Sequence, residues 1–366
     1  MTQTYNILGL GASYGSLLAV KLLAAGHSVK LACLPAEAEL INAEGVRVRI
    51  PVRGSASLVE VDSRKLPGRL SAAVPAQIDP AGFDLVVLAM QEPQYRASGV
   101  RELVAAIAAA KIPCMSIMNM PPLPFLARIQ AIVPDESLRR CYTDASVWDG
   151  FDPAFMTLCS PDAQAFRPPE EKVNVLQVRL PTNFKSAPFA HPAHNAMIRA
   201  LAEQIDAARF DDGSGAKVDL PVKLRVHDSL FVPLAKWSML LAGNYRCIRD
   251  DDVVSIREAV HGNIAAAREA YEWVGALCRK LGAADADLVP FEKYANAAQS
   301  LESPSSAARA LANGATDIER VDRLVQALAS RQGMQSAEID RIVQRVDGWL
   351  ERNRRKRDEA AAKRVA

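Results

Sequence analysis

Three glycines separate a short apolar run from an alanine- and leucine-rich run near the start of the sequence. Residues 5–10 (YNILGL) predict a buried strand, and residues 16–25 (SLLAVKLLAA) predict a helix. Gly9, Gly11 and Gly15 lie where the strand turns into the helix. A tight turn of this kind lets backbone amides and the helix N-terminus approach a pyrophosphate group. The start of the chain therefore predicts an anion-binding turn in an α/β domain.

Strands and helices alternate through the first part of the chain. Residues 27–33 predict a second strand, and residues 84–89 (DLVVLA) are apolar without alternation, which is typical of a strand covered on both faces. A helix at 101–110 and a strand at 112–118 follow. This order predicts a parallel sheet and, with the glycine turn, a Rossmann-type domain over residues 1–220.

The stretch from about 140 to 190 interrupts this alternation. Prolines recur there, and the run VNVLQVRL at 173–180 alone predicts a strand. We therefore expect an irregular insertion in the N-terminal domain. A helix at 193–207 and a polar, glycine-containing loop at 211–217 lead to the predicted domain boundary.

Nearly every run beyond residue 228 has the pattern of a helix. The predicted helices are 230–245, 254–281, 316–330 and 336–356. We expect an all-helical domain over residues 221–350 and a charged tail over 351–366. Because the tail mixes both signs of charge, a solvated helix end explains it better than a nucleic-acid patch.

Composition excludes several classes of partner. Lys and Arg number 44 against 42 Asp and Glu, and this formal charge of +2 gives no general reason to bind nucleic acid or an acidic membrane. The first residues lack a cationic segment, and glycines with Lys21 interrupt the apolar run, so we expect no membrane span and a cytoplasmic protein. The cysteines at 33, 114, 141, 159, 247 and 278 form no C-x-x-C pair. We expect them to be reduced and mostly buried, with no metal site.

The glycine spacing is G-x-G-x-x-x-G, one residue longer than the usual dinucleotide fingerprint. We interpret it as a cofactor-binding turn in which Ser13 or Tyr14 occupies the extra space, and a turn kept for backbone geometry alone is the alternative. The second strand ends at 32–35 (ACLP) without the acid that holds a ribose diol or the arginine that holds a 2′-phosphate, so NAD and NADP both stay open. The expected cofactor-binding residues of the turn are Gly9, Gly11, Ala12, Ser13, Tyr14 and Gly15.

Lys236 is the one charged residue in the apolar stretch from Leu230 to Gly243. Burial favours the neutral amine, which suits a lysine to proton transfer near neutral pH. Asn244 follows eight residues later, about 80° around an α-helix, so both side chains are expected to address one site. A lysine that snorkels to solvent is the alternative.

The segment SPSSAARALANGATDIERVD carries hydroxyl groups and carboxylates. A carboxylate such as that of Asp317 would complete a proton-transfer pair with Lys236. Thr316 and Glu319 also fit a capping box, in which acids near a helix start serve structure alone, and both interpretations stay open.

The glycine turn, Asn119, Lys236 and the serine-rich segment before Asp317 stand in the chain order of ketopantoate reductases, and the sequence resembles that family over most of its length. The resemblance implies a Rossmann domain followed by a helical domain similar to that of 6-phosphogluconate dehydrogenases. It also implies NADPH and a 2-oxo acid as ligands in the cleft between the domains. A homodimer is the expected assembly.

The resemblance also implies roles for individual residues. Lys236 matches the catalytic lysine, Asn244 an asparagine two turns later, and Asn119 the asparagine near nicotinamide and substrate. Asp317 stands where a glutamate normally binds the substrate hydroxyl. The resemblance thus assigns catalysis to Lys236 and Asp317, substrate binding to Asn119, Asn244, Ser305 and Ser306, and further cofactor contacts to Gln91 and Asn119.

Several positions depart from the pattern of the family. Leu34 stands where an arginine usually meets the phosphate of NADP, and Gln91 stands where a strand-end lysine is usual. Leu240 replaces a substrate-facing asparagine, and Asp317 is one methylene shorter than glutamate. These departures affect contacts with cofactor and substrate, whereas the fold depends on other positions.

Our leading hypothesis is an NAD(P)-dependent reductase of a 2-oxo acid-like carbonyl, with Lys236 as the general acid. One alternative is an opine- or β-hydroxyacid-type dehydrogenase on another carbonyl or imine, in which His191 and His194 serve as acid and base. The other is a non-catalytic NAD(P)-binding sensor.

Overall fold

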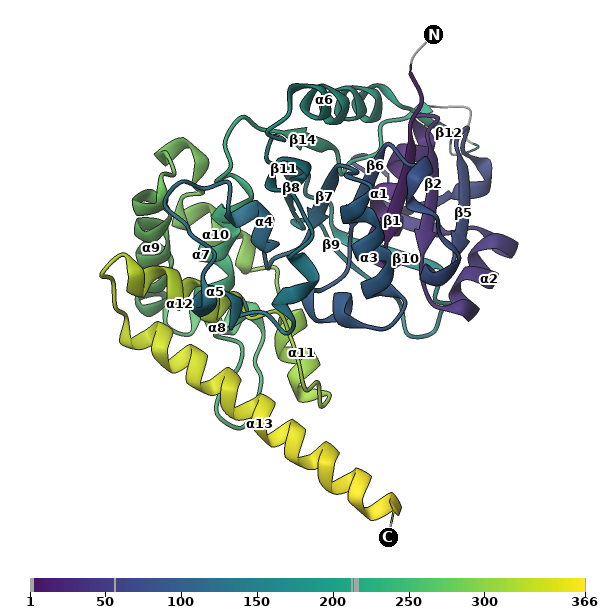
Figure 1. Cartoon of the computed structure of the whole chain (residues 1–366). Coiled ribbons are helices and arrows are strands. Elements are labelled where there is room, and N and C mark those ends of the chain that lie inside the picture. Colours follow the sequence, from purple (N-terminus) through teal and green to yellow (C-terminus); the bar gives the residue numbers. More distant parts are fainter. Residues whose placement is uncertain (1–2, 56, 212, 214–216, 366) are drawn as a thin grey trace. The chain divides into compact units, whose positions relative to one another are not determined.

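The computed structural model describes residues 3–55, 57–211, 213 and 217–365. The chain divides into two compact units (Figure 1). Residues Met1–Arg128 and Ser146–Pro233 form the first, which we call the sheet unit. Residues Ile129–Ala145 and Leu234–Ala366 form the second, the helical unit. Each is described by itself.

The secondary structure follows in chain order. The strands are β1 (Asn6–Leu10), β2 (Ser28–Ala32), β3 (Arg47–Pro51), β4 (Leu58–Asp62), β5 (Arg69–Ala73), β6 (Leu85–Leu88), β7 (Cys114–Ile117), β8 (Met156–Ser160), β9 (Gln164–Phe166), β10 (Val175–Leu180), β11 (Phe184–Ser186), β12 (Phe210–Asp211), β13 (Lys217–Val218) and β14 (Leu224–Val226). The α-helices are α1 (Tyr14–Ala24), α2 (Pro35–Glu44), α3 (Val100–Ala109), α4 (Leu123–Leu126), α5 (Glu136–Arg139), α6 (Pro192–Ala207), α7 (Lys236–Met239), α8 (Ile256–His261), α9 (Ile264–Leu281), α10 (Phe291–Ala298), α11 (Ser306–Ala312), α12 (Val321–Arg331) and α13 (Ala337–Val365). Short 3-10 helices are η1 (Ser63–Lys65), η2 (Pro75–Gln77), η3 (Pro80–Gly82), η4 (Glu92–Arg96), η5 (Ala145–Trp148), η6 (Pro153–Phe155), η7 (Pro233–Ala235) and η9 (Asp285–Asp287), and η8 (Leu240–Asn244) is a π-helix.

The large sheet of the sheet unit has the strand order β14-β11-β8-β7-β6-β1-β2-β5 (Figure 1). Every neighbouring pair from β5 to β8 is parallel, whereas β11 runs antiparallel to β8. Numbered along the chain, the six parallel strands have the order 3-2-1-4-5-6, which is typical of Rossmann domains that bind dinucleotides. The predicted α/β class with a parallel sheet is thus confirmed.

The stretch 140–190, expected to be an irregular insertion, contains four strands. Two of them, β8 and β11, extend the large sheet, and the other two, β9 and β10, pair with β3 and β4 in a second sheet of order β4-β3-β10-β9. The predicted strand at 173–180 therefore exists as β10, but it lies outside the large sheet. The other three strands are short and flanked by prolines, which hides their pattern in the sequence.

Helix α1 is the centre of the sheet unit. It contacts β1, β2 and β5 of the large sheet and β3 and β10 of the second sheet. All residues from Gly15 to Leu23 are buried, as expected of a helix that is apolar on every side. Because both sheets contact α1, Lys21 on this helix is buried as well.

The described part of the helical unit contains no sheet, which confirms the predicted helical class of this half. The segment α7–η8 occupies its interior, where it contacts α8, α9, α11 and α12. The predicted helix 254–281 is split into α8 and α9, because Asn263 leaves the helical conformation and its side chain accepts a hydrogen bond from the amide of Ala266 at 3.1 Å.

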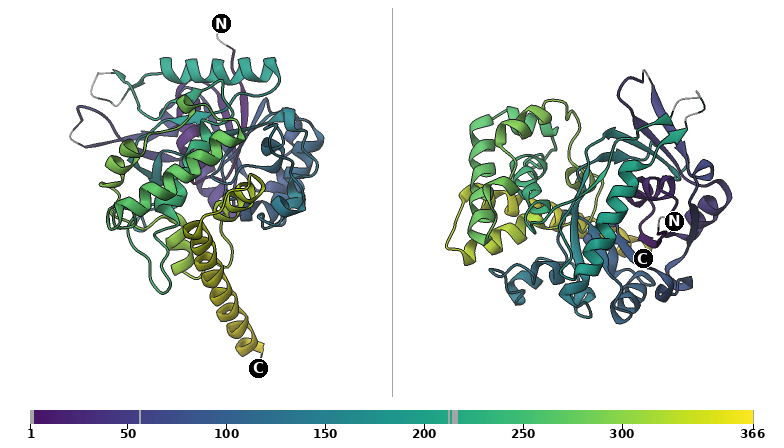
Figure 2. Two further views of the ribbon diagram at one scale, coloured as in Figure 1. Left: turned by 90° about the vertical axis from the view of Figure 1, so that its left-hand side faces the viewer. Right: turned by 90° about the horizontal axis from the view of Figure 1, so that it is seen from above.

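The last helix runs farther than predicted, to Val365. Figures 1 and 2 show its C-terminal half extending away from the other helices of this unit, and residues 354–363 are exposed. The expected charged tail is therefore helical through Val365. Asn353 is buried there, and its amide donates hydrogen bonds to the carbonyl oxygens of Leu311 and Ala315, both at 2.9 Å.

All six cysteines are free, and five are buried while Cys33 is half-buried, as predicted. Among the residues that the structure describes, no helix is both long and apolar enough to cross a membrane.

Candidate functional site

The glycine turn lies where the strand order of the large sheet reverses, between β1 and β6. Gly11 has a φ of +102°, and a Cβ there would lie 2.8 Å from the Ala89 carbonyl oxygen and 2.6 Å from Met90 Cγ. A Cβ on Gly9 would lie 2.9 Å from Leu31 Cδ2. The position of Gly11 thus requires glycine, whereas a Cβ on Gly9 would meet only the end of the flexible Leu31 side chain. The turn lies against the end of β6, at the place where Rossmann domains bind their ligand.

The start of α1 offers backbone donors rather than side chains. Ser13 precedes the helix and makes no side-chain cap. The Tyr14 side chain turns into the protein, because its hydroxyl donates to the Ala163 carbonyl oxygen at 2.7 Å and its ring packs edge-on against Phe184. Burial raises the pKa of Tyr14 well above its usual range, so the hydroxyl stays neutral.

The same edge of the sheet carries two further predicted residues. Gln91 is exposed just after β6, and its backbone amide donates to the side-chain oxygen of Gln94 at 2.9 Å. Asn119 is half-buried two residues after β7, the neighbour of β6. Because parallel strands end at one edge, Gly11, Gln91 and Asn119 lie along the same side of the sheet.

A charged pair at the end of β2 was missed in the sequence. Leu34 is 74% exposed and offers no polar group there. Arg167, which follows β9, forms an ion pair with Glu37 in the first turn of α2. Glu37 stands three residues past Leu34, and Arg167 lies 130 residues from Glu37 in the sequence, so a local pattern predicts neither.

Lys236 and Asn244 stand on a segment that is not the uniform α-helix predicted over 230–245. It consists of η7, α7 and the π-helix η8, and the amide of Tyr245 donates to the Leu240 carbonyl oxygen at 2.9 Å. The predicted 80° between the two side chains assumed an α-helix and does not apply. Both residues are half-buried among buried neighbours, and π-turns often occur at functional sites.

Gly243 and Tyr294 explain the π-turn. The Tyr294 hydroxyl donates to the Met239 carbonyl oxygen at 3.1 Å, and a Cβ on Gly243 would overlap that hydroxyl. A glycine is therefore needed for the tyrosine to reach the backbone between Lys236 and Asn244. The ring of Tyr294 is held in turn by stacking on Tyr271, with centroids 5.4 Å apart.

The two predicted serines have different surroundings. Ser305 is buried, and its hydroxyl donates to the Asn244 carbonyl oxygen at 2.7 Å while accepting from the amide of Ala308 at 3.1 Å. It therefore caps α11 and fixes the backbone of Asn244. Ser306 is exposed.

Asp317 lies in the loop before α12, which begins only at Val321. The predicted helix start at 316 is therefore wrong, and Thr316 and Glu319 form no capping box. The Asp317 carboxylate accepts from Arg354 Nη2 at 3.0 Å and from the Thr316 hydroxyl at 3.1 Å.

Tyr245 joins this loop to the π-segment. Its hydroxyl donates to the Glu319 carbonyl oxygen at 2.5 Å and accepts from the amide of Val321 at 3.1 Å. Together with the Ser305 contact to Asn244, these bonds fix the segments that carry Asn244 and Asp317 within one unit.

His191 and His194 lie at the start of α6, with ring centroids 4.9 Å apart. His194 packs against Phe155, which directly precedes β8, a strand in the parallel block with β1. The pair thus lies at the amino edge of the large sheet, opposite to Gly11. Burial and the neighbouring His191 lower the pKa of His194.

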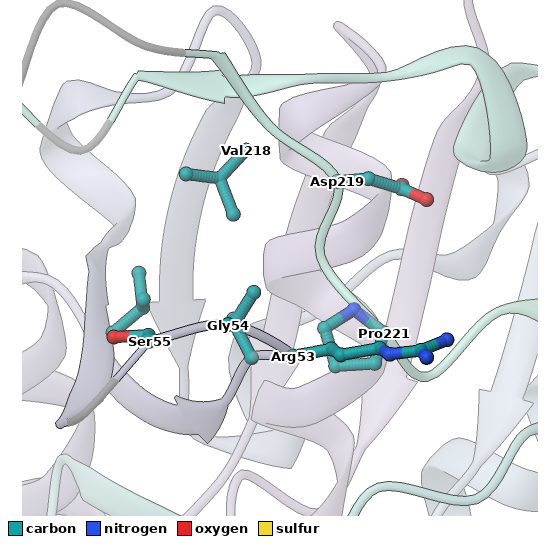
Figure 3. A pocket seen from close by; sticks show the side chains of 8 residues that line it. Arg53, Gly54, Ser55, Val218, Asp219 and Pro221 are labelled. Atoms are coloured by element: carbon teal, nitrogen blue, oxygen red, sulfur yellow. The ribbon is translucent and has the colours of Figure 1, made fainter.

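A pocket of about 660 Å³ opens elsewhere in the sheet unit (Figure 3). It lies between the loop after β3 and the segment after β13, where Arg53 and Asp219 contribute its charged groups. None of the predicted site residues lines it. Within the described ranges, no three His, Cys, Asp or Glu side chains gather as a metal site.

No protein-family model matches the sequence, and no curated protein matches it. Solved structures do match. The 2-dehydropantoate 2-reductase of Methylococcus capsulatus has a TM-score of 0.63 at 13% identity, covering 95% of this chain and 97% of that chain. This chain has the ketopantoate reductase fold. A ketopantoate reductase of Ralstonia eutropha has a TM-score of 0.61 at 17% identity, covering 96% of this chain and 100% of that chain. A dimeric ketopantoate reductase of Staphylococcus aureus has a TM-score of 0.57 at 8% identity, covering 95% of this chain and 99% of that chain.

These matches confirm the predicted ketopantoate reductase resemblance for the fold. At the positions that depart from the family, Leu34 and Gln91 are exposed at strand ends, whereas Leu240 is buried in η8. Leu240 therefore serves packing in this chain.

Proposed function

We propose that this protein is a nicotinamide-dependent oxidoreductase that reduces a 2-oxo acid-like carbonyl to a hydroxy acid. The observation that carries the proposal is the conformation of Gly11, which has a positive φ and no room for a Cβ. This glycine lies where the strand order of a Rossmann-type sheet reverses, which is where such sheets bind dinucleotides. The residues there fit a dinucleotide. The start of α1, which no side chain caps, suits a pyrophosphate.

The cofactor, when bound, supplies the hydride. In this proposal the backbone from Gly9 to Gly15 holds the pyrophosphate, and Gln91 and Asn119 contact the ribose and nicotinamide portions from the ends of β6 and β7. The side chain of Tyr14 supports the turn from within the protein through its bond to Ala163.

Lys236 is proposed to donate a proton from Nζ to the carbonyl oxygen of the substrate as negative charge develops there. Asp317 orients that oxygen, and Arg354 with Thr316 fixes the direction of the carboxylate. Asn244 and Ser306 are proposed to contact polar groups of the substrate.

Ser305 takes a supporting place in this mechanism. Because its buried hydroxyl bonds the Asn244 carbonyl oxygen and the Ala308 amide, we propose that it positions Asn244 instead of contacting the substrate. A cytoplasmic homodimer is also proposed: the free cysteines suit a reducing compartment, and the ketopantoate reductase of Staphylococcus aureus is described as dimeric.

The test is a titration with NADPH and NADH separately, followed by the decay of reduced-nicotinamide absorbance with ketopantoate and a panel of 2-oxo acids. Binding with turnover of one of these acids would support the proposal. Binding without turnover of any 2-oxo acid would favour another carbonyl or imine or a sensor, and no binding would refute the assignment of the turn. The histidine-based alternative has less support because the His191–His194 pair lies at the opposite edge of the sheet.

A further inference from the structure

An ion pair stands at the end of β2, where the chain between Ala32 and Pro35 supplies no charge of its own. Arg167 Nη2 donates to Glu37 Oε1. The Arg167 side chain is 30% exposed and that of Glu37 12% exposed, so the carboxylate is enclosed while the guanidinium reaches solvent. The arrangement presents a positive group at this end of the strand.

The segment before Arg167 is attached to the glycine turn. The carbonyl oxygen of Ala163 accepts the hydroxyl of Tyr14, the first residue of α1. Strand β9 then leads to Arg167. One short segment therefore joins the start of α1 to the end of β2, the two places between which a Rossmann domain holds the pyrophosphate and the adenosine ribose.

The thiol of Cys33 is close enough to both charged groups to be affected by them. Cys33 is the first residue after β2, and burial raises the pKa of its thiol to about 12. The negative charge of Glu37 raises that pKa further, and the positive charge of Arg167 lowers it. Both charged groups therefore act on the thiol at the strand end.

We propose that Arg167 binds the 2′-phosphate of NADPH and makes the protein select NADPH over NADH, with Glu37 as the counter-ion that holds the guanidinium beside β2. This inference rests on the proposed function. A guanidinium has five donors, and the bond to Glu37 uses Nη2, so its other edge is available for bidentate contact with a phosphate. Glu37 is enclosed and already paired, which disfavours it as the acceptor of a ribose diol.

The experiment measures the Kd of NADPH and NADH for the wild type, Arg167→Met and the control Arg225→Met. Arg225 is also paired with a carboxylate, Asp206 at 3.1 Å, but on the edge strand β14. Loss of charge-assisted bonds predicts a roughly 10- to 100-fold weaker binding of NADPH by Arg167→Met, with NADH changed less than about twofold. The control is expected to bind both cofactors as the wild type does.

Three results would overturn the inference: a wild type that prefers NADH, an Arg167→Met variant that loses both cofactors equally, or one that loses neither. Weaker NADH binding by Glu37→Gln would assign the ribose to the acid instead. If Arg167→Met does not fold, Arg167→Lys is compared with the wild type for binding of adenosine 2′,5′-bisphosphate and of adenosine 5′-monophosphate. Only the binding of the 2′,5′-bisphosphate is expected to be weaker in the variant. Failure of the wild type to bind either cofactor would instead refute the proposed function.

Discussion

Lys21 is a buried lysine near the end of α1. Its side chain is 3% exposed, and its ammonium donates to the carbonyl oxygens of Leu220 at 2.8 Å and Pro221 at 3.0 Å. Burial, and next the charge of Lys223, lower its pKa to about 7, against a smaller opposing effect of Asp219. The folded state therefore binds the proton of this lysine less tightly than the unfolded chain does.

This shift predicts a pH dependence of stability. Above about pH 7 the folded protein releases the proton, whereas the unfolded chain keeps it up to about pH 10.5. Unfolding then takes up a proton, so the free energy of unfolding rises with pH in this window, by at most about 1.4 kcal/mol per pH unit. Urea unfolding of the wild type and of Lys21→Met measures the effect as a difference, in which other titrating groups cancel. A difference that stays constant from neutral to alkaline pH would contradict the shift.

The role of a single residue could be predicted where the signal lies in its immediate sequence neighbours. The glycines of the turn and Lys236 stand out because each breaks the pattern of its immediate neighbours. Arg167 and Glu37 could not be predicted in the same way, because their pairing depends on how β9 is placed against α2 in the folded sheet unit.

The π-helix η8 follows α7, the short helix that begins at Lys236, and ends at Asn244. Its extra residue per turn depends on close contact between Gly243 and Tyr294, since the tyrosine hydroxyl bonds the Met239 carbonyl oxygen. The Val260 side chain confines the same space, with Cγ2 3.2 Å from a Cβ on Gly243.

Gly243→Ala is therefore expected to destabilise the protein. Alanine gains about 1 kcal/mol of helix propensity over glycine, but the overlap with Tyr294 outweighs it, and we expect a net loss of about 1–3 kcal/mol together with a lower kcat. Thermal unfolding and turnover measure both effects. Gly82→Ala is the control, because that exposed glycine has no atom within 4 Å of an added Cβ. An unchanged melting temperature and kcat for Gly243→Ala would refute this role of the π-turn.

Elements were predictable where one pattern runs for many residues. The first strand and helix, the helix at 193–207 and the helical second half have such patterns. Strands β8 and β11 were missed because they are short and flanked by prolines, and the π-turn was missed because it depends on a tyrosine fifty-five residues away from Met239.

At the scale of the whole molecule, each unit is assembled from separate segments. Residues 129–145 belong to the helical unit although they interrupt the sheet unit in the sequence. Arg331 on α12 holds them, donating to the Val133 carbonyl oxygen at 2.8 Å and to the Ser137 hydroxyl at 2.9 Å. Contacts over such separations leave no periodic pattern in the sequence. The loop at 211–217 and the helical pattern beyond it therefore predicted a single boundary near 220.

Lys236 is proposed to act as the proton donor in a cofactor-dependent reduction. The most direct measurement compares kcat of Lys236→Ala with that of Lys280→Ala, an exposed lysine of the same unit, at saturating cofactor and with the 2-oxo acid that the wild type turns over. We predict a loss of about 10²- to 10⁴-fold for Lys236→Ala, unchanged cofactor affinity, and wild-type turnover for Lys280→Ala. Near-wild-type turnover by Lys236→Ala would exclude this role of the lysine.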